Sequence, residues 1–90
     1  MDLVVANATV IDGTGSPGVP GWVGVEGDRI AGVGRGDPPA AARTIDGRGL
    51  VVAPGFVDVH NHSDLSPFVL PTMPSTVRQG VTSIVASPWA

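Results

Sequence analysis

The sequence predicts an α/β fragment, with a small β-rich domain over residues 1–53 and the truncated start of a parallel α/β domain over residues 54–90. Three observations indicate this. Thirteen glycines and nine prolines, about a quarter of the 90 residues, favour many turns and few long helices. The apolar runs between those turns have the length of strands. After Pro54-Gly55 the pattern changes to strand, helix, strand, which is typical of a parallel sheet.

The first part of the chain is expected to form a small antiparallel layer. Gly27-Asp28 predicts a hairpin turn, because glycine at the first position suits a two-residue connection. Asn7-Ala8 is interpreted as a turn between two strands, since Asn tolerates the left-handed conformation. Gly47-Arg48-Gly49 predicts another tight connection. The expected strands are Leu3 to Ala6, Thr9 to Ile11, Trp22 to Glu26, Arg29 to Val33, Thr44 to Asp46 and Leu50 to Ala53, with loops over residues 12–21 and 34–42.

The second part predicts a single βαβ unit. Phe56 to His60 is a short apolar strand, and Val81 to Val85 is the next. A helix is expected over Thr72 to Gln79, with Pro74 in its first turn and Gly80 just after its end. The length excludes a complete (β/α)₈ barrel, which needs roughly 250 residues. Because a parallel sheet needs more than one such unit, this segment is interpreted as the beginning of a larger α/β domain.

Charge and composition exclude several classes of protein. Eight acidic residues and five arginines give a formal net charge of −3, which argues against a nucleic-acid partner. The chain has no lysine for Schiff-base or carboxylated-lysine chemistry, and no cysteine for disulfides or thiolate ligands. It contains neither a signal peptide nor an apolar run long enough to cross a membrane. We therefore expect a soluble cytoplasmic protein without a membrane or nucleic-acid partner.

His60-Asn61-His62 is the main candidate for chemistry. Residues i and i+2 of an extended chain point to the same side, so His60 and His62 can reach one metal ion. They follow a parallel strand, where α/β folds place their sites, and zinc suits imidazole ligands. The alternative is a pair of surface histidines in a polar loop. Asp58 lies in phase with His60, and it either orients a ligating imidazole or is held by backbone N–H groups.

Several segments resemble the amidohydrolase superfamily, and together they cover nearly the whole chain in order. Pro54 to His62 resembles its first-strand signature, Asp2 to Gly13 its usual opening, Gly27 to Ile30 its "GDRI" turn, and Ile45-Asp46 its "ID-x-x-G" step. The resemblance implies N-terminal β-sandwich strands, completed elsewhere in such enzymes by C-terminal strands. It also implies the first βαβ unit of a metal-dependent TIM barrel.

Within that superfamily the chain is similar to the N-acyl-D-amino-acid deacylases, or D-aminoacylases, through His62 to Leu65, Met73 to Ser83 and Ser87 to Trp89. This similarity implies a small-molecule N-acyl-D-amino acid substrate and zinc held in part by His60 and His62. In the implied mechanism zinc lowers the pKa of a water toward about 7 and polarises the acyl carbonyl. The chain departs from the family after its second barrel strand, where a Cys ligand is expected and Val85 leads directly into Ala86. The later ligands and the catalytic Asp are also absent.

Two other functions stay open from the sequence. A cyclic amidase such as a dihydropyrimidinase shares the His-x-His pair, but bridges its metals with a carboxylated lysine. A non-enzymatic β-rich module would use Trp22 and its strand edges for protein contacts. In each case we expect the 90-residue chain to be inactive as an enzyme by itself, with no catalytic residue assigned within it.

Overall fold

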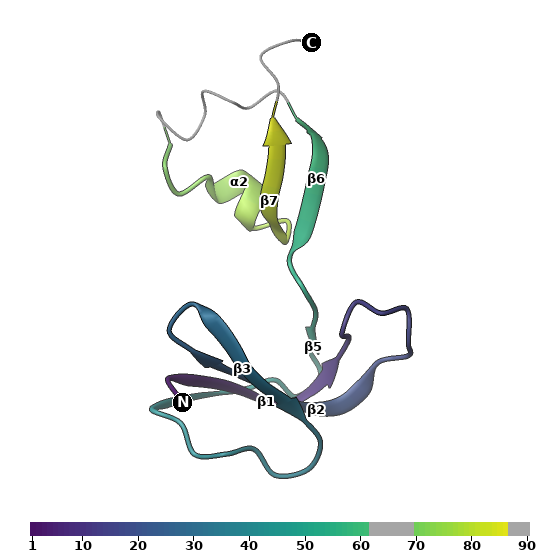
Figure 1. Cartoon of the computed structure of the whole chain (residues 1–90), viewed down its shortest axis with the longest axis vertical. Coiled ribbons are helices and arrows are strands. Elements are labelled where there is room, and N and C mark those ends of the chain that lie inside the picture. The colour runs from purple at the N-terminus through teal and green to yellow at the C-terminus, as the bar shows by residue number, and fades with distance from the viewer. Residues whose placement is uncertain (62–69, 87–90) are drawn as a thin grey trace. The chain divides into compact units, whose positions relative to one another are not determined.

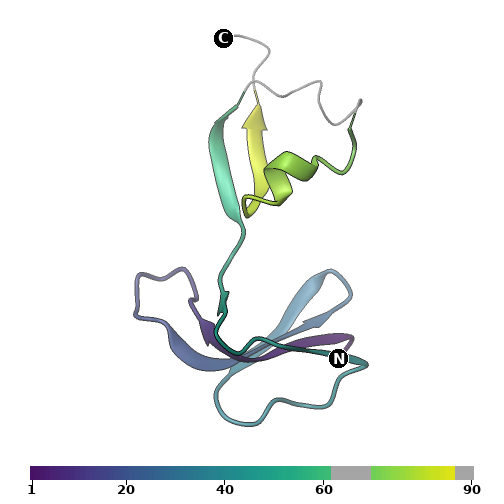
Figure 2. The same cartoon turned by 180° about the vertical axis from the view of Figure 1, so that it is seen from behind.

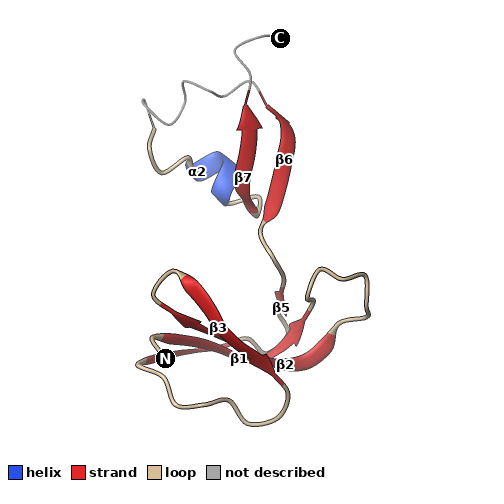
Figure 3. Ribbon diagram, in the orientation of Figure 1, coloured by secondary structure: helices blue, strands red, loops and turns tan. Residues whose placement is uncertain are grey.

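The computed structural model describes residues 1–61 and 70–86 of the chain. These residues belong to two compact units, Met1–Pro54 and Gly55–Ala90 (Figure 1). Among the described residues of both units, strands predominate and helix is scarce (Figure 3).

The first unit is a five-stranded sheet with β1 in a central position. Its strands are β1 (Leu3–Val10), β2 (Val19–Glu26), β3 (Arg29–Gly34), β4 (Arg43–Asp46) and β5 (Val51–Val52). The strand order is β3-β2-β1-β4, and β5 pairs with β1 farther along the same edge. β1 therefore contacts three other strands, and the sheet depends on it.

The hairpin of β2 and β3 confirms the turn predicted at Gly27-Asp28. The two strands pair antiparallel, and Glu26 lies opposite Arg29 at the turn. Gly27 adopts φ 59°, which suits glycine at the first position of the turn. Its N–H donates to Oδ2 of Asp2, 2.6 Å away, so a carboxylate next to β1 helps to hold the turn.

Asn7 lies in a bulge, so the prediction of a turn at Asn7-Ala8 is wrong. β1 continues from Leu3 to Val10, and its register with β2 shifts between Val5 and Ala8. Asn7 does take the left-handed conformation, with φ 59°. A bulge inserts one extra residue without ending the pairing, and a single sequence cannot distinguish it from a turn. β2 also begins at Val19, inside the expected loop.

β4 and β5 run parallel to β1, which corrects the expectation of a purely antiparallel layer. β4 pairs along Leu3–Ala6 of β1, and β5 pairs along Thr9–Val10. The loop over residues 35–42 carries the chain from β3 at one edge of the sheet to the opposite side of β1. A long connection of this kind allows the next strand to pair parallel to β1, whereas a two-residue hairpin allows only antiparallel pairing.

Gly47 lies at the break between β4 and β5, beside the bulge in β1. Its N–H donates to the carbonyl oxygen of Ala6 at 2.7 Å, and its own carbonyl accepts from the N–H of Leu50 at 2.9 Å. The N–H of Thr9 then donates to the Leu50 carbonyl at 3.0 Å. Gly47 is buried, and a Cβ there would lie 2.7 Å from the Cβ of Ala8. This close approach requires glycine.

Gly47→Ala is expected to destabilise the first unit by about 1–3 kcal/mol, because the added methyl group overpacks the contact with Ala8. Urea unfolding followed by circular dichroism measures the change. Arg48→Ala is the matched control, since the Arg48 side chain is 79% exposed and such positions change stability by about 0.5 kcal/mol or less. Equal stability of the two variants would contradict the close packing at Gly47.

The core of the first unit consists of small side chains. The buried apolar residues are Val4, Ala6, Ala8, Val10 and Val23, all on β1 and β2. Trp22 lies against the backbone of β3, because a Cβ on Gly34 would be 2.7 Å from its Cζ2 atom. Because Gly34 has no side chain, the indole ring of Trp22 has room to pack against β3.

The second unit consists of β6 (Phe56–Asn61), α2 (Pro74–Val77) and β7 (Val81–Ala86) in its described part. β6 and β7 pair parallel, as expected, and lie side by side with α2 beside β7 (Figures 1 and 2). The N–H of Phe56 donates to the Gly80 carbonyl at 2.8 Å and sets the start of the pairing.

α2 is shorter than the helix expected over Thr72 to Gln79. Met73 precedes it with φ 45°, outside the helical region. The ring of Pro74 disfavours right-handed helical backbone at the preceding residue, so the helix begins at Pro74. It ends before Gly80, which has φ 85° and donates its N–H to the Val77 carbonyl at 2.9 Å. Pro74 does lie at the first helical position, as predicted.

Candidate metal site at the end of β6

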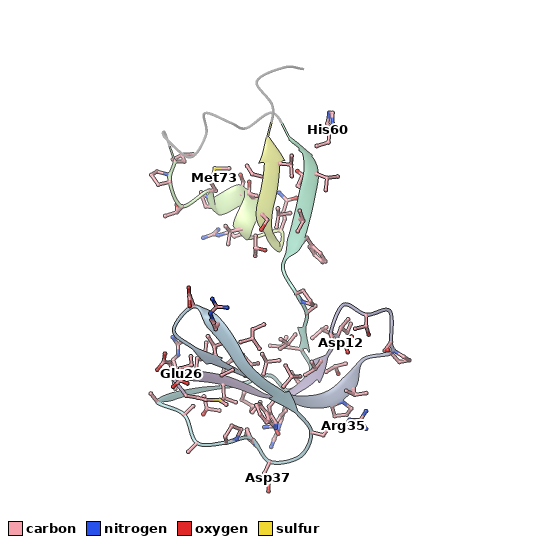
Figure 4. All side chains as sticks on the ribbon, in the orientation of Figure 1. Asp12, Glu26, Arg35, Asp37, His60 and Met73 are labelled. Atoms are coloured by element: carbon pink, nitrogen blue, oxygen red, sulfur yellow. The ribbon has the colours of Figure 1, made fainter. Side chains whose placement is uncertain are left out.

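His60 lies near the carboxyl end of β6, on an exposed part of the second unit (Figure 4). β7 runs parallel beside it, with Asp58 opposite Ile84 and Asn61 opposite Ala86. The carboxyl ends of the two strands therefore meet at the same edge of the sheet. That edge is where parallel α/β folds place ligands and metals.

Asp58 contacts the backbone of the residue that we predict to bind metal. Its Oδ1 atom accepts a hydrogen bond from the backbone N–H of His60 at 3.2 Å, and its side chain is half-buried. This contact supports the role in which backbone N–H groups hold the carboxylate. Orientation of the imidazole by Asp58 stays a prediction.

His62 lies outside the described residues, so the structure does not test its pairing with His60. Within residues 1–61 and 70–86, no group of three His, Cys, Asp or Glu side chains is placed to hold a metal ion. An imidazole donor such as His60 suits zinc, but zinc sites in proteins take three or four protein ligands. The described part of the chain therefore supplies at most part of a metal site.

An apolar hollow in the first unit was not predicted from the sequence. It has a volume of about 140 Å³. It is lined by Val10, Ile11, Asp12, Val23, Ile30, Val33, Val52, Ala53 and Pro54. Its walls come from β1, β2, β3 and β5 and from the residues that follow β1 and β5, so it depends on pairing partners that are distant in sequence. The lining is almost wholly apolar, and it offers a metal only the carboxylate of Asp12.

No helix within the described ranges is long and apolar enough to cross a membrane.

Comparison with known proteins relates both the sequence and the fold to one group of enzymes. No family model matches the chain. It is 45% identical over 84 residues to a D-aminoacylase of Alcaligenes xylosoxydans xylosoxydans, covering 93% of this chain and 17% of that protein. It superposes with a TM-score of 0.90 and 45% identity on a D-aminoacylase whose crystal structure defines a subset of amidohydrolases, covering 96% of this chain and 18% of that one.

The structure of a third similar protein contains zinc. This is the N-acyl-D-glutamate deacylase of Bordetella bronchiseptica, whose structure contains zinc and a phosphonate mimic of the tetrahedral intermediate. The superposition has a TM-score of 0.87 and 38% identity, over 94% of this chain and 18% of that one. The strand-rich structure thus matches the N-terminal domain of D-aminoacylases. Although it spans less than a fifth of their length, this chain is therefore related, over nearly all of its own length, to the D-aminoacylase group of amidohydrolases.

Proposed function

We propose that the chain is the N-terminal part of a cytoplasmic, zinc-dependent amidohydrolase that removes the acyl group from N-acyl-D-amino acids. The observation that carries this proposal is the 45% identity to a D-aminoacylase over 93% of the chain. The position of His60 at the carboxyl end of a parallel strand supports it, because catalytic side chains of (β/α)₈ barrels lie at those ends.

The two units have separate roles in this proposal. The first unit provides strands of a β-sandwich whose second layer comes from elsewhere in the enzyme. Exposed apolar side chains on its sheet support this role, such as Ile30 at 69% and Val33 at 55%. The second unit begins the TIM barrel, and β6 and β7 are its first two strands. Phe56, Val57 and Val59 of β6 are each more than half exposed and would contact the rest of the barrel.

His60 and His62 would hold the zinc ion together with ligands that this chain lacks. Zinc bound there would supply Lewis-acid polarisation of the acyl carbonyl and activation of water. The role of Asp58 is to fix the backbone of His60, through the 3.2 Å hydrogen bond, and to orient its imidazole. Because the chain has no cysteine and no assigned proton-transfer base, hydrolysis requires the remainder of the enzyme.

The metal assignment predicts weak zinc binding by the 90-residue chain, because two imidazoles supply only half of a tetrahedral shell. Isothermal calorimetry with zinc should show this binding, and His60→Ala or His62→Ala should each remove it. Asp37→Ala, which alters an exposed carboxylate in the first unit, should leave it unchanged. Tight one-to-one binding that survives both histidine substitutions would refute the assignment.

A further inference from the structure

The chain contains two Asp-Gly steps, Asp12-Gly13 and Asp46-Gly47, and their environments differ. At such a step the glycine nitrogen can attack the Cγ carbon of the preceding aspartate, since no glycine side chain hinders the approach. A five-membered succinimide ring results. Its opening by water converts part of the aspartate to isoaspartate. The attack needs a glycine nitrogen that is free to move.

The nitrogen of Gly47 is held in place. Its N–H donates to the Ala6 carbonyl of β1 at 2.7 Å, and the residue is buried directly after the end of β4. A Cβ at this position would lie 3.1 Å from the Ala6 oxygen, so Gly47 lies directly against the backbone of β1. Ring closure at Asp46 would break that hydrogen bond and displace the edge of the sheet.

The nitrogen of Gly13 is held much less firmly. Gly13 is exposed in the loop between β1 and β2, with φ 83°, and Asp12 lies at the start of the same loop (Figure 4). Among the residues that the structure describes, its N–H donates to no hydrogen-bond acceptor. The side chain of Asp12 is also exposed, so water can reach both carbonyl groups of the ring.

We propose that Asp12 is a site of spontaneous isoaspartate formation in the folded protein, whereas Asp46 is protected. The Gly13 nitrogen forms a bond to Cγ of Asp12 and loses its proton, while the carboxyl group loses its hydroxyl as water. Water then adds to either carbonyl carbon of the imide and breaks one C–N bond. Attack at the main-chain carbonyl leaves the backbone running through the former side chain, which lengthens it by one carbon.

Thr14 slows the ring closure at Asp12. Oδ1 of Asp12 accepts hydrogen bonds from the Thr14 hydroxyl at 2.6 Å and from the Thr14 N–H at 2.9 Å. Both hydrogen bonds lower the pKa of Asp12 below its usual value, and the bond from the Thr14 hydroxyl has the larger effect. The ionised carboxylate is a poorer electrophile than the protonated acid. Removal of the hydroxyl should therefore speed ring closure at Asp12.

Prolonged incubation of the 90-residue chain near neutral pH tests the proposal. Isoaspartate is labelled with an isoaspartyl methyltransferase and assigned by peptide mapping. We expect it to accumulate several times faster at residue 12 than at residue 46. Unfolding in urea should bring the two rates together. Asp12→Glu should lose the label at residue 12, and Thr14→Val should increase it.

Three outcomes would overturn the inference. These are equal rates at the two steps in the folded chain, a faster rate at residue 46, and no isoaspartate at residue 12. A Thr14→Val rate at or below that of the parent would remove the role of Thr14. Circular dichroism of each variant before incubation shows whether it keeps the strand content of the parent.

Discussion

Substitution of His60 by alanine is expected to abolish activity when residues 55–62 of this chain replace the matching strand of an intact D-aminoacylase. The unsubstituted graft should keep both metal and activity, because it restores the histidine pair in its proper context. The metal, its ligands and the proton-transfer base act together in catalysis. Loss of one metal ligand therefore removes most of the rate enhancement. The measurements are kcat/KM for release of the acyl group and the metal content of the purified protein.

Asp58→Asn in the same graft tests whether the Asp58 carboxylate orients the His60 imidazole without itself binding the metal. A carboxylate that orients a ligating imidazole contributes about 10–100-fold to metal affinity or activity, so a loss in that range is expected. Ser83→Ala, on the neighbouring β7, is a control that lies outside the proposed metal site. If the unsubstituted graft folds but binds no metal, His60 and His62 are not the metal pair.

Val4→Ala is expected to destabilise the first unit of the 90-residue chain by about 2 kcal/mol, through lost burial and the cavity that remains. Val4 is fully buried, and the other buried apolar side chains of the described residues are valines and alanines, so its removal takes away a large part of a small core. Val59→Ala is the matched control, since that side chain is 74% exposed in this chain. Thermal unfolding followed by circular dichroism compares the two variants.

The same contrast should appear in amide hydrogen exchange. The buried apolar residues of the described chain all lie on β1 and β2, whereas β6 carries large exposed apolar side chains. An isolated two-stranded sheet is marginally stable in water, so amides of β6 and β7 should exchange much faster than those of β1. Equal protection in both units, or a single cooperative transition that Val59→Ala shifts as much as Val4→Ala, would contradict this expectation.

Local sequence determined the elements whose cause lies within a few residues. Gly27-Asp28 forms the predicted hairpin because a two-residue turn needs only glycine at its first position and apolar runs on both sides. Phe56 to His60 forms a strand, and its parallel pairing with Val81 to Val85 follows from the intervening helical segment. The position of His60 at the carboxyl end of β6 follows from the same pattern. The pairing of His60 with His62 at a metal remains a prediction.

Tertiary structure decided the features that depend on partners far along the chain. Asn7 forms a bulge instead of a turn because β2 continues to pair on both sides of it. β4 and β5 run parallel to β1 because the chain after β3 returns along the opposite side of the central strand. The apolar hollow exists only because this pairing places four strands around it. Hydrophobic periodicity and turn composition do not show which strands pair with each other. The choice of pairing partners determined the architecture of the first unit.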